Sequence, residues 1–171
     1  MRVGTLLGIA VGLAACAESP AAPPRVIDQP PSLSAVTSSS QSTIPFSRRL
    51  WISCANNGLG ENVQLIGAIE MHSHSTETGD GGMHMSTHIR PHGVVGVGQS
   101  TGVMYRGTGG TFEAEGWAEG GFPYVYSFVN NFRIIGQGPG NNLLVHLVVH
   151  QRLDANGELT AEVDLSSSDC K

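Results

Sequence analysis

The stretch from Tyr124 to Leu165 decides the fold class. It reads YVYSFVNNFRII (124–135), a turn in GPGNN (138–142), LLVHLVVH (143–150), a second turn in DANG (154–157) and finally ELTAEVDL (158–165). The three runs favour β-strands, because β-branched and aromatic residues are common in strands. Gly and Asn tolerate the positive φ angles that tight reversals need, so the two turns predict a meander of antiparallel strands.

Alternation of apolar and polar residues continues the same pattern towards the N-terminus. The odd-numbered positions between Asn62 and His74 are mostly apolar, and those between Met83 and Ile89 are apolar or Thr. Short β-rich runs also lie at 94–97, 103–105 and 112–117. We therefore expect an all-β protein with a single antiparallel domain of about eight strands over residues 45–171. The short links favour an up-and-down barrel over a two-sheet sandwich, since closure removes exposed edges.

Composition limits the partners that the protein can have. The chain has 171 residues, enough for one domain with a core, and a formal net charge of −5. Its one lysine is Lys171, and no basic patch is visible along the sequence, which argues against nucleic-acid binding.

The N-terminus is typical of an exported protein. Arg2 is followed by an apolar run to Ala15, which is too short to span a hydrocarbon core of roughly 30 Å, so we expect a signal peptide over residues 1–15. The run ends in LAAC (13–16), which resembles the lipobox of bacterial lipoproteins. This resemblance implies that Cys16 carries a lipid anchor. An Ala at position 17 in place of Asp implies the outer membrane or cell surface rather than the inner membrane. The alternative is an ordinary signal peptide with an incidental thiol.

Two further features follow from export. Residues 16–44 are rich in Ala, Ser and Pro, too poor in apolar side chains to form a core, and are expected to be a disordered tether. Once Cys16 is lipidated, Cys54 and Cys170 remain, at the two ends of the β domain. Because exported proteins form disulfides, we expect these two cysteines to pair.

The histidines suggest a metal site. All seven fall in the expected β domain, and five of them lie between His72 and His92. Strand alternation places five candidate ligands on one face, namely Glu70, His72, His74, His84 and His88. A hairpin that reverses at 78–79 would set His74 opposite His84, and such imidazoles could bind Zn²⁺ or Cu²⁺. The alternative is a set of solvated or lumen-lining histidines. Met71, Met83 and Met85 fall on the opposite, apolar face, which is typical of core residues.

Catalysis has little support in the sequence. No serine lies in a Gly-x-Ser-x-Gly motif, and no glycine-rich loop precedes a helix. Glu113 and Glu115 share a strand face, as the carboxylates of a glycosidase would, although such a pair is more often solvated. Tyr124 and Tyr126 share one parity and would line a ligand cavity in a barrel or pack in the core.

The segment FRIIGQGPGNNLLVH at 132–146, with the DANG turn and the Asp-Cys near the C-terminus, resembles a segment of uncharacterised secreted bacterial β-rich proteins. The resemblance covers roughly the last quarter of the chain and implies an exported β domain, with no catalytic residue. We therefore expect a lipid-anchored, non-catalytic binding or structural protein outside the cytoplasm, whose ligand or protein partner is unknown. The alternative is a His-based Zn²⁺ or Cu²⁺ binding protein of the cell envelope.

Overall fold

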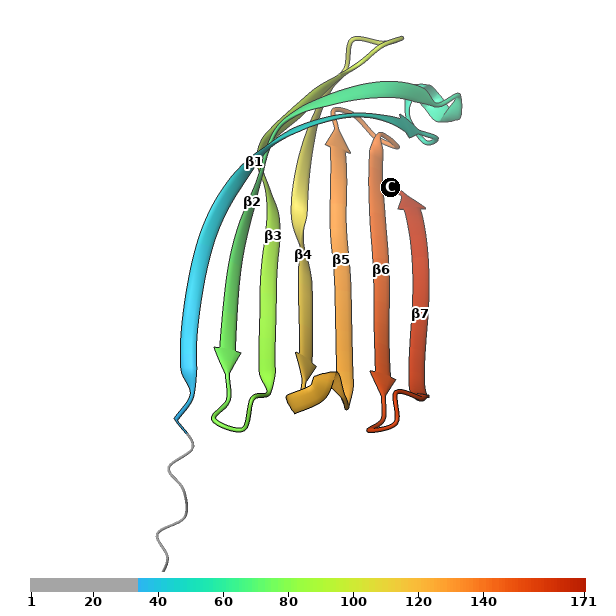
Figure 1. The fold of residues 1–171 in the computed structure, drawn as a ribbon. Coiled ribbons are helices and arrows are strands. Elements are labelled where there is room, and N and C mark those ends of the chain that lie inside the picture. Colours follow the sequence, from blue (N-terminus) through green and yellow to red (C-terminus); the bar gives the residue numbers. More distant parts are fainter. Residues whose placement is uncertain (1–33) are drawn as a thin grey trace, which may run out of the picture. The chain divides into compact units, whose positions relative to one another are not determined.

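The computed structural model describes residues 34–171, which contain one antiparallel sheet of seven strands (Figure 1). The strands follow in chain order as β1 (Val36–Ile52), β2 (Glu61–Glu77), β3 (Met83–Gly98), β4 (Met104–Trp117), β5 (Tyr124–Gly136), β6 (Asn142–Leu153) and β7 (Leu159–Cys170). Two short 3-10 turns, η1 (Asn56–Gly58) and η2 (Glu119–Gly121), join β1 to β2 and β4 to β5. The expected all-β class and the meander are confirmed. The expected signal peptide, Cys16 and most of the tether lie outside the described residues.

The sheet bends sharply at one end. The later part of β1 and the first part of β2 arch across the ends of the other strands (Figure 1). Gly67 has a φ of +155°, and a Cβ there would lie 2.7 Å from the Cα of Val94, so only glycine allows β2 to pass this close to β3. The pairing of β2 with β3 shifts register at the same point. We call the arched segment, residues 46–66, the hook.

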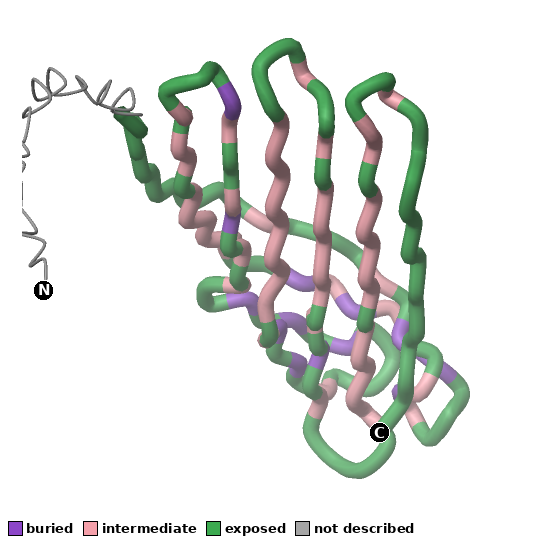
Figure 2. Tube along the Cα trace, turned by 90° about the horizontal axis from the view of Figure 1, so that it is seen from below, coloured by how far each residue is buried: buried purple, intermediate pink, exposed green. Residues whose placement is uncertain are grey.

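The core lies where the hook folds back on the sheet. Seven apolar residues are buried, namely Ile52, Ala55, Val63, Leu65, Val94, Tyr105 and Ile134. Figure 2 shows most of the buried positions gathered at this curled end, whereas the long strands are half-buried or exposed. We call the sheet face that carries this core the inner face, and the opposite one the outer face. Each fully buried Ile, Leu or Val side chain stabilises the fold by about 1.5–3 kcal/mol, so stability is concentrated at the hook.

Away from the hook the sheet is a single layer. Every residue of β7 is exposed, as are the first ten residues of β1, Val36–Pro45. This exposed part of β1 pairs with β2 through its backbone. Its side-chain hydroxyls also bond to those of β2, with Ser38 Oγ 2.7 Å from Ser75 Oγ. The folded domain thus begins before residue 45. The Ser-rich run resembles a tether because a strand with both faces in water needs no apolar residues.

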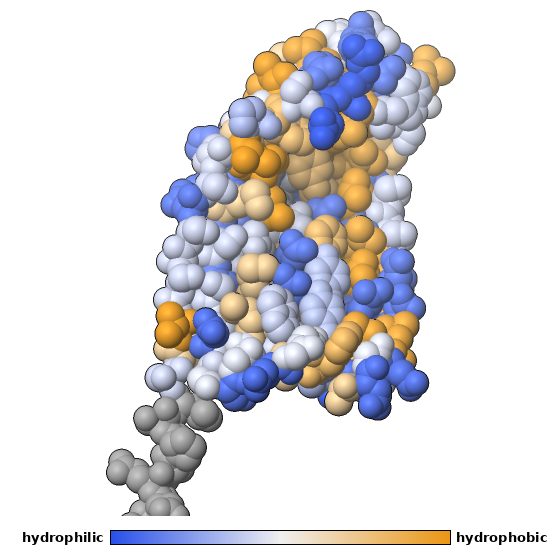
Figure 3. All heavy atoms as spheres, in the orientation of Figure 1, coloured by the Kyte–Doolittle hydropathy of each residue, from blue (hydrophilic) through white to orange (hydrophobic). Residues whose placement is uncertain are grey.

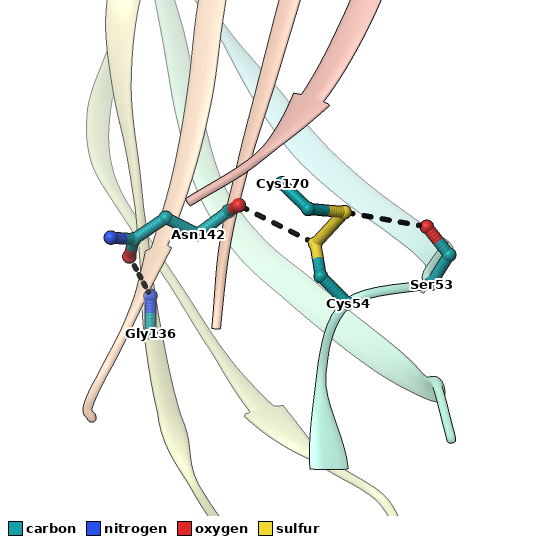
Figure 4. Close-up of a disulfide and its surroundings, with 5 residues drawn as sticks. All are labelled: Ser53, Cys54, Gly136, Asn142 and Cys170. Atoms are coloured by element: carbon teal, nitrogen blue, oxygen red, sulfur yellow. Dashed lines mark hydrogen bonds between the residues drawn. A yellow bond between two sulfur atoms is a disulfide. The ribbon is translucent and has the colours of Figure 1, made fainter. Parts of the chain in front are cut away.

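The sheet is not closed, so the preference for a barrel is not supported. β1 and β7 come together only at the hook, where Cys54 and Cys170 form the expected disulfide with Cα atoms 5.5 Å apart (Figure 4). Ser53 Oγ donates a hydrogen bond to the sulfur of Cys170 at 3.6 Å. Elsewhere most inner-face residues of the two edge strands are polar, so these strands supply little apolar lining for a closed lumen. The bond joins the two edge strands at one end and leaves the other end of the sheet open.

The Cys54–Cys170 bond should be a large part of the stability of this fold. The two residues are 116 positions apart, and cross-linking a loop of that length stabilises by about 4–5 kcal/mol in the chain-entropy model. We expect Cys170→Ser to lower the free energy of unfolding by about that amount in urea titrations. Wild-type protein unfolded in the presence of a reductant is the matched control and should agree with the variant. A loss below about 1 kcal/mol would show that the hook holds without the bond.

Candidate functional site

A hollow lies on the inner face beneath the hook. It has a volume of about 360 Å³ and is lined mainly by apolar side chains of five strands, including Phe46, Leu50, Ile69, Ile89, Phe132 and Val145. Figure 3 shows hydrophobic residues around a recess below the arch. The volume falls within the range of about 300–1,000 Å³ that is typical of small-molecule sites.

Four polar residues, Arg48, Arg90, Thr111 and Asn130, also line the hollow, and the guanidinium of Arg90 is bonded to Glu70. Thr111 Oγ1 donates to Asn130 Oδ1 at 2.9 Å, and the same oxygen accepts the backbone N–H of Phe132 at 3.1 Å. These two bonds fix the amide of Asn130 so that its Nδ2 group remains a donor. Arg48 is an exposed cation, and its Nη1 donates only a long bond of 3.4 Å to the Ser47 carbonyl. Apolar walls with a few placed polar groups are what binds and orients a small molecule.

The sequence carries one local signal for this hollow. Phe46, Arg48 and Leu50 alternate with polar or outward residues, as on a half-buried strand. They lie at the very start of the expected domain, and the sequence does not reveal which distant strand they would face. The bend at Gly67 brings them against β5 and β6.

A second group of inner-face residues lies further from the hook. Continuous pairing of β4 with β5, with no bulge in between, places Tyr124, Tyr126 and Phe128 of this group on the same face as Phe132 and Ile134, which lie at the hook. The rings of Trp117 and Tyr124 stack with centroids 6.4 Å apart. Such a row of rings beside acidic residues forms a polar aromatic surface rather than an enclosed cavity.

Each carboxylate beside these rings is held by its own tyrosine. Tyr124 Oη donates to Glu115 Oε2 at 2.9 Å, and Tyr126 Oη donates to Glu113 Oε1 at 3.0 Å. Burial, with the bond to Glu115 as a further cause, raises the pKa of Tyr124 to about 12, and the pKa of Tyr126 is raised in the same way. Both tyrosines therefore stay protonated and keep donating. The carboxylates act as acceptors that fix the rings, which is a structural role.

The expected metal ligands share the outer face, but the pairs differ from those expected. His72 lies opposite His88, whereas His74 lies opposite Ser86 and His84 opposite Thr76. The hairpin reverses over residues 78–82, with the N–H of Thr78 bonded to the Gly82 carbonyl, so the reversal is centred on Asp80. The sequence-based register is therefore wrong by two residues, and His74 and His84 are diagonal neighbours rather than a directly opposed pair.

Glu70 is the centre of a hydrogen-bond network on the outer face. Its Oε2 accepts from Arg90 Nε at 2.8 Å, and its Oε1 accepts from Gln41 Nε2 at 2.7 Å and lies 3.1 Å from His72 Nε2. Nδ1 of His92 lies 3.9 Å from Oε2. The hydrogen bond from Arg90 is the largest cause that lowers the pKa of Glu70, to about 2, and His72 adds to it.

This network competes with a metal ion for the same carboxylate. A guanidinium at 2.8 Å already neutralises Glu70, and a divalent cation would have to displace it. Among residues 34–171 no three His, Cys, Asp or Glu side chains are grouped so that they could hold a metal ion. The five residues proposed as Zn²⁺ or Cu²⁺ ligands thus share a face without forming a coordination shell.

A buried carboxylate at the hook was not foreseen. Glu61 is 1% exposed and accepts bonds from the Thr101 and Tyr105 hydroxyls at 2.8 and 2.9 Å, and from the N–H groups of Ser100 and Thr101. Burial alone would raise the pKa of Glu61, but these bonds together outweigh it and hold the pKa below its usual value. Glu61 therefore ties the loop between β3 and β4 to the core.

Comparisons with protein-family models, with curated proteins and with solved structures find no match for this chain. Within residues 34–171, none of the helical segments has the length and apolar character needed to cross a membrane.

The Glu70 network should make stability depend on pH. The pKa of Glu70 is about 2 in the folded protein, below its ordinary value of 4.5. The ionised carboxylate therefore stabilises the fold at pH values above 4.5, and this contribution is lost as the pH falls from 4.5 towards 2. We expect Glu70→Gln to flatten the fall in stability over that range in urea unfolding followed by tryptophan fluorescence. The control is Glu77→Gln, in the same strand on the inner face, which should retain the wild-type slope. An unchanged slope in Glu70→Gln would contradict the assignment.

Proposed function

We propose that the protein is a lipid-anchored, extracytoplasmic, non-catalytic binding protein whose ligand is a small, mainly apolar molecule held beneath the hook. The observation that carries this proposal is the hollow of about 360 Å³ between the hook and β5 and β6. It combines apolar walls with a fixed amide at Asn130 and a cation at Arg48. A ligand with an apolar body and one polar or anionic end matches these groups.

The disulfide supports the proposed location. Structural disulfides form in oxidising compartments, and the bond between Cys54 and Cys170 holds the hook that covers the hollow. Reduction would release the end of β7 from the hook. We therefore infer that the protein binds its ligand outside the cytoplasm, where the disulfide that holds the hook can form.

Filling the hollow should abolish binding. The probe is N-phenyl-1-naphthylamine, an uncharged apolar fluorophore whose emission rises on leaving water. We expect Val145→Trp to weaken its binding at least about tenfold, because indole fills apolar volume that the ligand needs. The control is Val148→Trp, in the same strand on the outer face. Equal loss in both variants, or none in Val145→Trp, would contradict the site.

The anchor can be tested separately. We expect a chain expressed with its own N-terminus in a bacterium to incorporate labelled palmitate and to sediment with membranes. Cys16→Ser should lose both properties, because the thioether to diacylglycerol needs the thiol. Cys54→Ser is the control, and it should keep the label although it lacks the disulfide. Labelled Cys16→Ser protein would show that the lipobox resemblance is misleading.

A further inference from the structure

All seven histidines lie on the outer face of the sheet. His72 and His92 lie near Glu70, and His88 packs on Phe112 with ring centroids 4.9 Å apart. His146 and His150 bond to Asn131 and Ser127 of β5 at 2.7 and 2.9 Å. His74 and His84 line a shallow trough of about 670 Å³ whose floor is Ala114 and Gly116. Alternation along three strands has thus put every imidazole on one side.

The fixed charges separate in the same way. The strand register places five arginines on the outer face, namely Arg49, Arg90, Arg106, Arg133 and Arg152. In the described strands only Glu70 and Asp169 oppose them there, while Asp80 lies in the hairpin loop near His84. Along the same strands, the inner face carries Glu61, Glu77, Glu113, Glu115, Glu162 and Asp164, and its one arginine in the described strands is Arg48. A chain of net charge −5 therefore has one cationic face.

We propose that this outer face binds an anionic polysaccharide, and that binding tightens as the pH falls through the range in which histidine gains its charge. The proposal concerns a different surface from the hollow and does not depend on it. Arginine and protonated imidazole both donate to sulfate and carboxylate oxygens, and arginine does so with two parallel bonds.

The shape and side chains of this face favour a flexible polysaccharide over other polyanions. The face is the outside of a curled sheet, so a flat bilayer would contact little of it, whereas a flexible polymer can follow it (Figure 1). Apart from the imidazoles, its aromatic residues in the described strands are Trp51 and Phe112, and Phe112 is covered by His88. Single-stranded nucleic acids need aromatic rings on which bases stack. Hydroxyls of Thr76, Ser86 and Ser127 line the trough and match sugar hydroxyls.

The pH dependence follows from which groups share this face. The fixed positive charge of this face comes from the arginines, with Arg90 neutralised by Glu70. The pKa of Glu70 is about 2, so this carboxylate does not change between pH 8 and 5. Protonation gives an imidazole one positive charge, and all seven imidazoles of this protein lie on the outer face. Asp169 near the hook and Asp80 in the β2–β3 loop are the remaining acids beside these imidazoles.

The test uses dextran sulfate, whose sulfates stay ionised throughout, so that any pH dependence comes from the protein. Uncharged dextran is the polymer control. The protein is tested as the full wild-type chain, which includes the described domain, residues 34–171. We expect it to bind dextran sulfate about tenfold more tightly near pH 5.5 than near pH 7.5. Added salt should weaken binding more steeply at the lower pH, because more ion contacts release counterions.

The deciding variant replaces His72, His74, His84 and His88 with Gln and should lose most of this pH dependence. Its control, Glu113→Gln with Glu162→Gln, makes the net charge less negative without altering the outer face, and should bind as wild type does. If the histidine variant fails to fold, as judged by circular dichroism, Arg133→Gln with Arg152→Gln should weaken binding at both pH values and keep the pH dependence.

Several outcomes would overturn the proposal. Unchanged pH dependence in the histidine variant would do so, as would tighter binding by the inner-face control, which would point to net charge alone. Binding to phosphatidylcholine vesicles that contain phosphatidylglycerol, without binding to dextran sulfate, would assign the face to a membrane surface. Preference for single-stranded oligonucleotides over dextran sulfate would assign it to nucleic acid.

Discussion

The fold depends on the hook being held against the far edge of the sheet. An antiparallel meander twists of its own accord, but this twist alone does not bring its first and last strands together. The disulfide between Cys54 and Cys170 joins the first and last strands, and Gly67 provides the sharp bend that lets them meet. The buried core and the hollow both lie in the space that this closure creates.

Away from the hook, both faces of the sheet are solvent-exposed surfaces, and neither is covered by a second layer. Both faces meet water, so neither is required to be apolar, and each has its own set of side chains. The inner face carries carboxylates held by tyrosines, and the outer face carries imidazoles and arginines. Stability comes from the hook, which leaves the sequence of the open part free to serve recognition.

The sequence predicted the elements well and their arrangement poorly, for physical reasons. Period-two alternation and Gly/Asn turns indicate strands and hairpins because both are local properties, and Cys54–Cys170 was inferred from export. Closure is not local: the polar residues of β1 resemble a tether because a strand exposed on both faces lacks the apolar signal of burial. The predicted pairing of the histidines was wrong because the hairpin reverses at Asp80, one residue beyond the expected reversal at 78–79. Moving a turn by one residue along the chain shifts the pairing of its two strands by two residues. The hollow was missed because Phe46 and Val145 are far apart in sequence.

The segregation of the two faces depends on one extra residue in β3. Before the bend the even-numbered residues point outward, and His92 lies there near Glu70. Beyond the bend the even-numbered Val94 is buried in the core. With strict alternation Val94 would point outward like His92, or His92 would point inward with Val94. Gly93, at φ +61°, absorbs the change of phase where the pairing with β4 is interrupted. The same irregularity that bends the sheet towards the hook therefore keeps the apolar core and the cationic face on opposite sides of one strand.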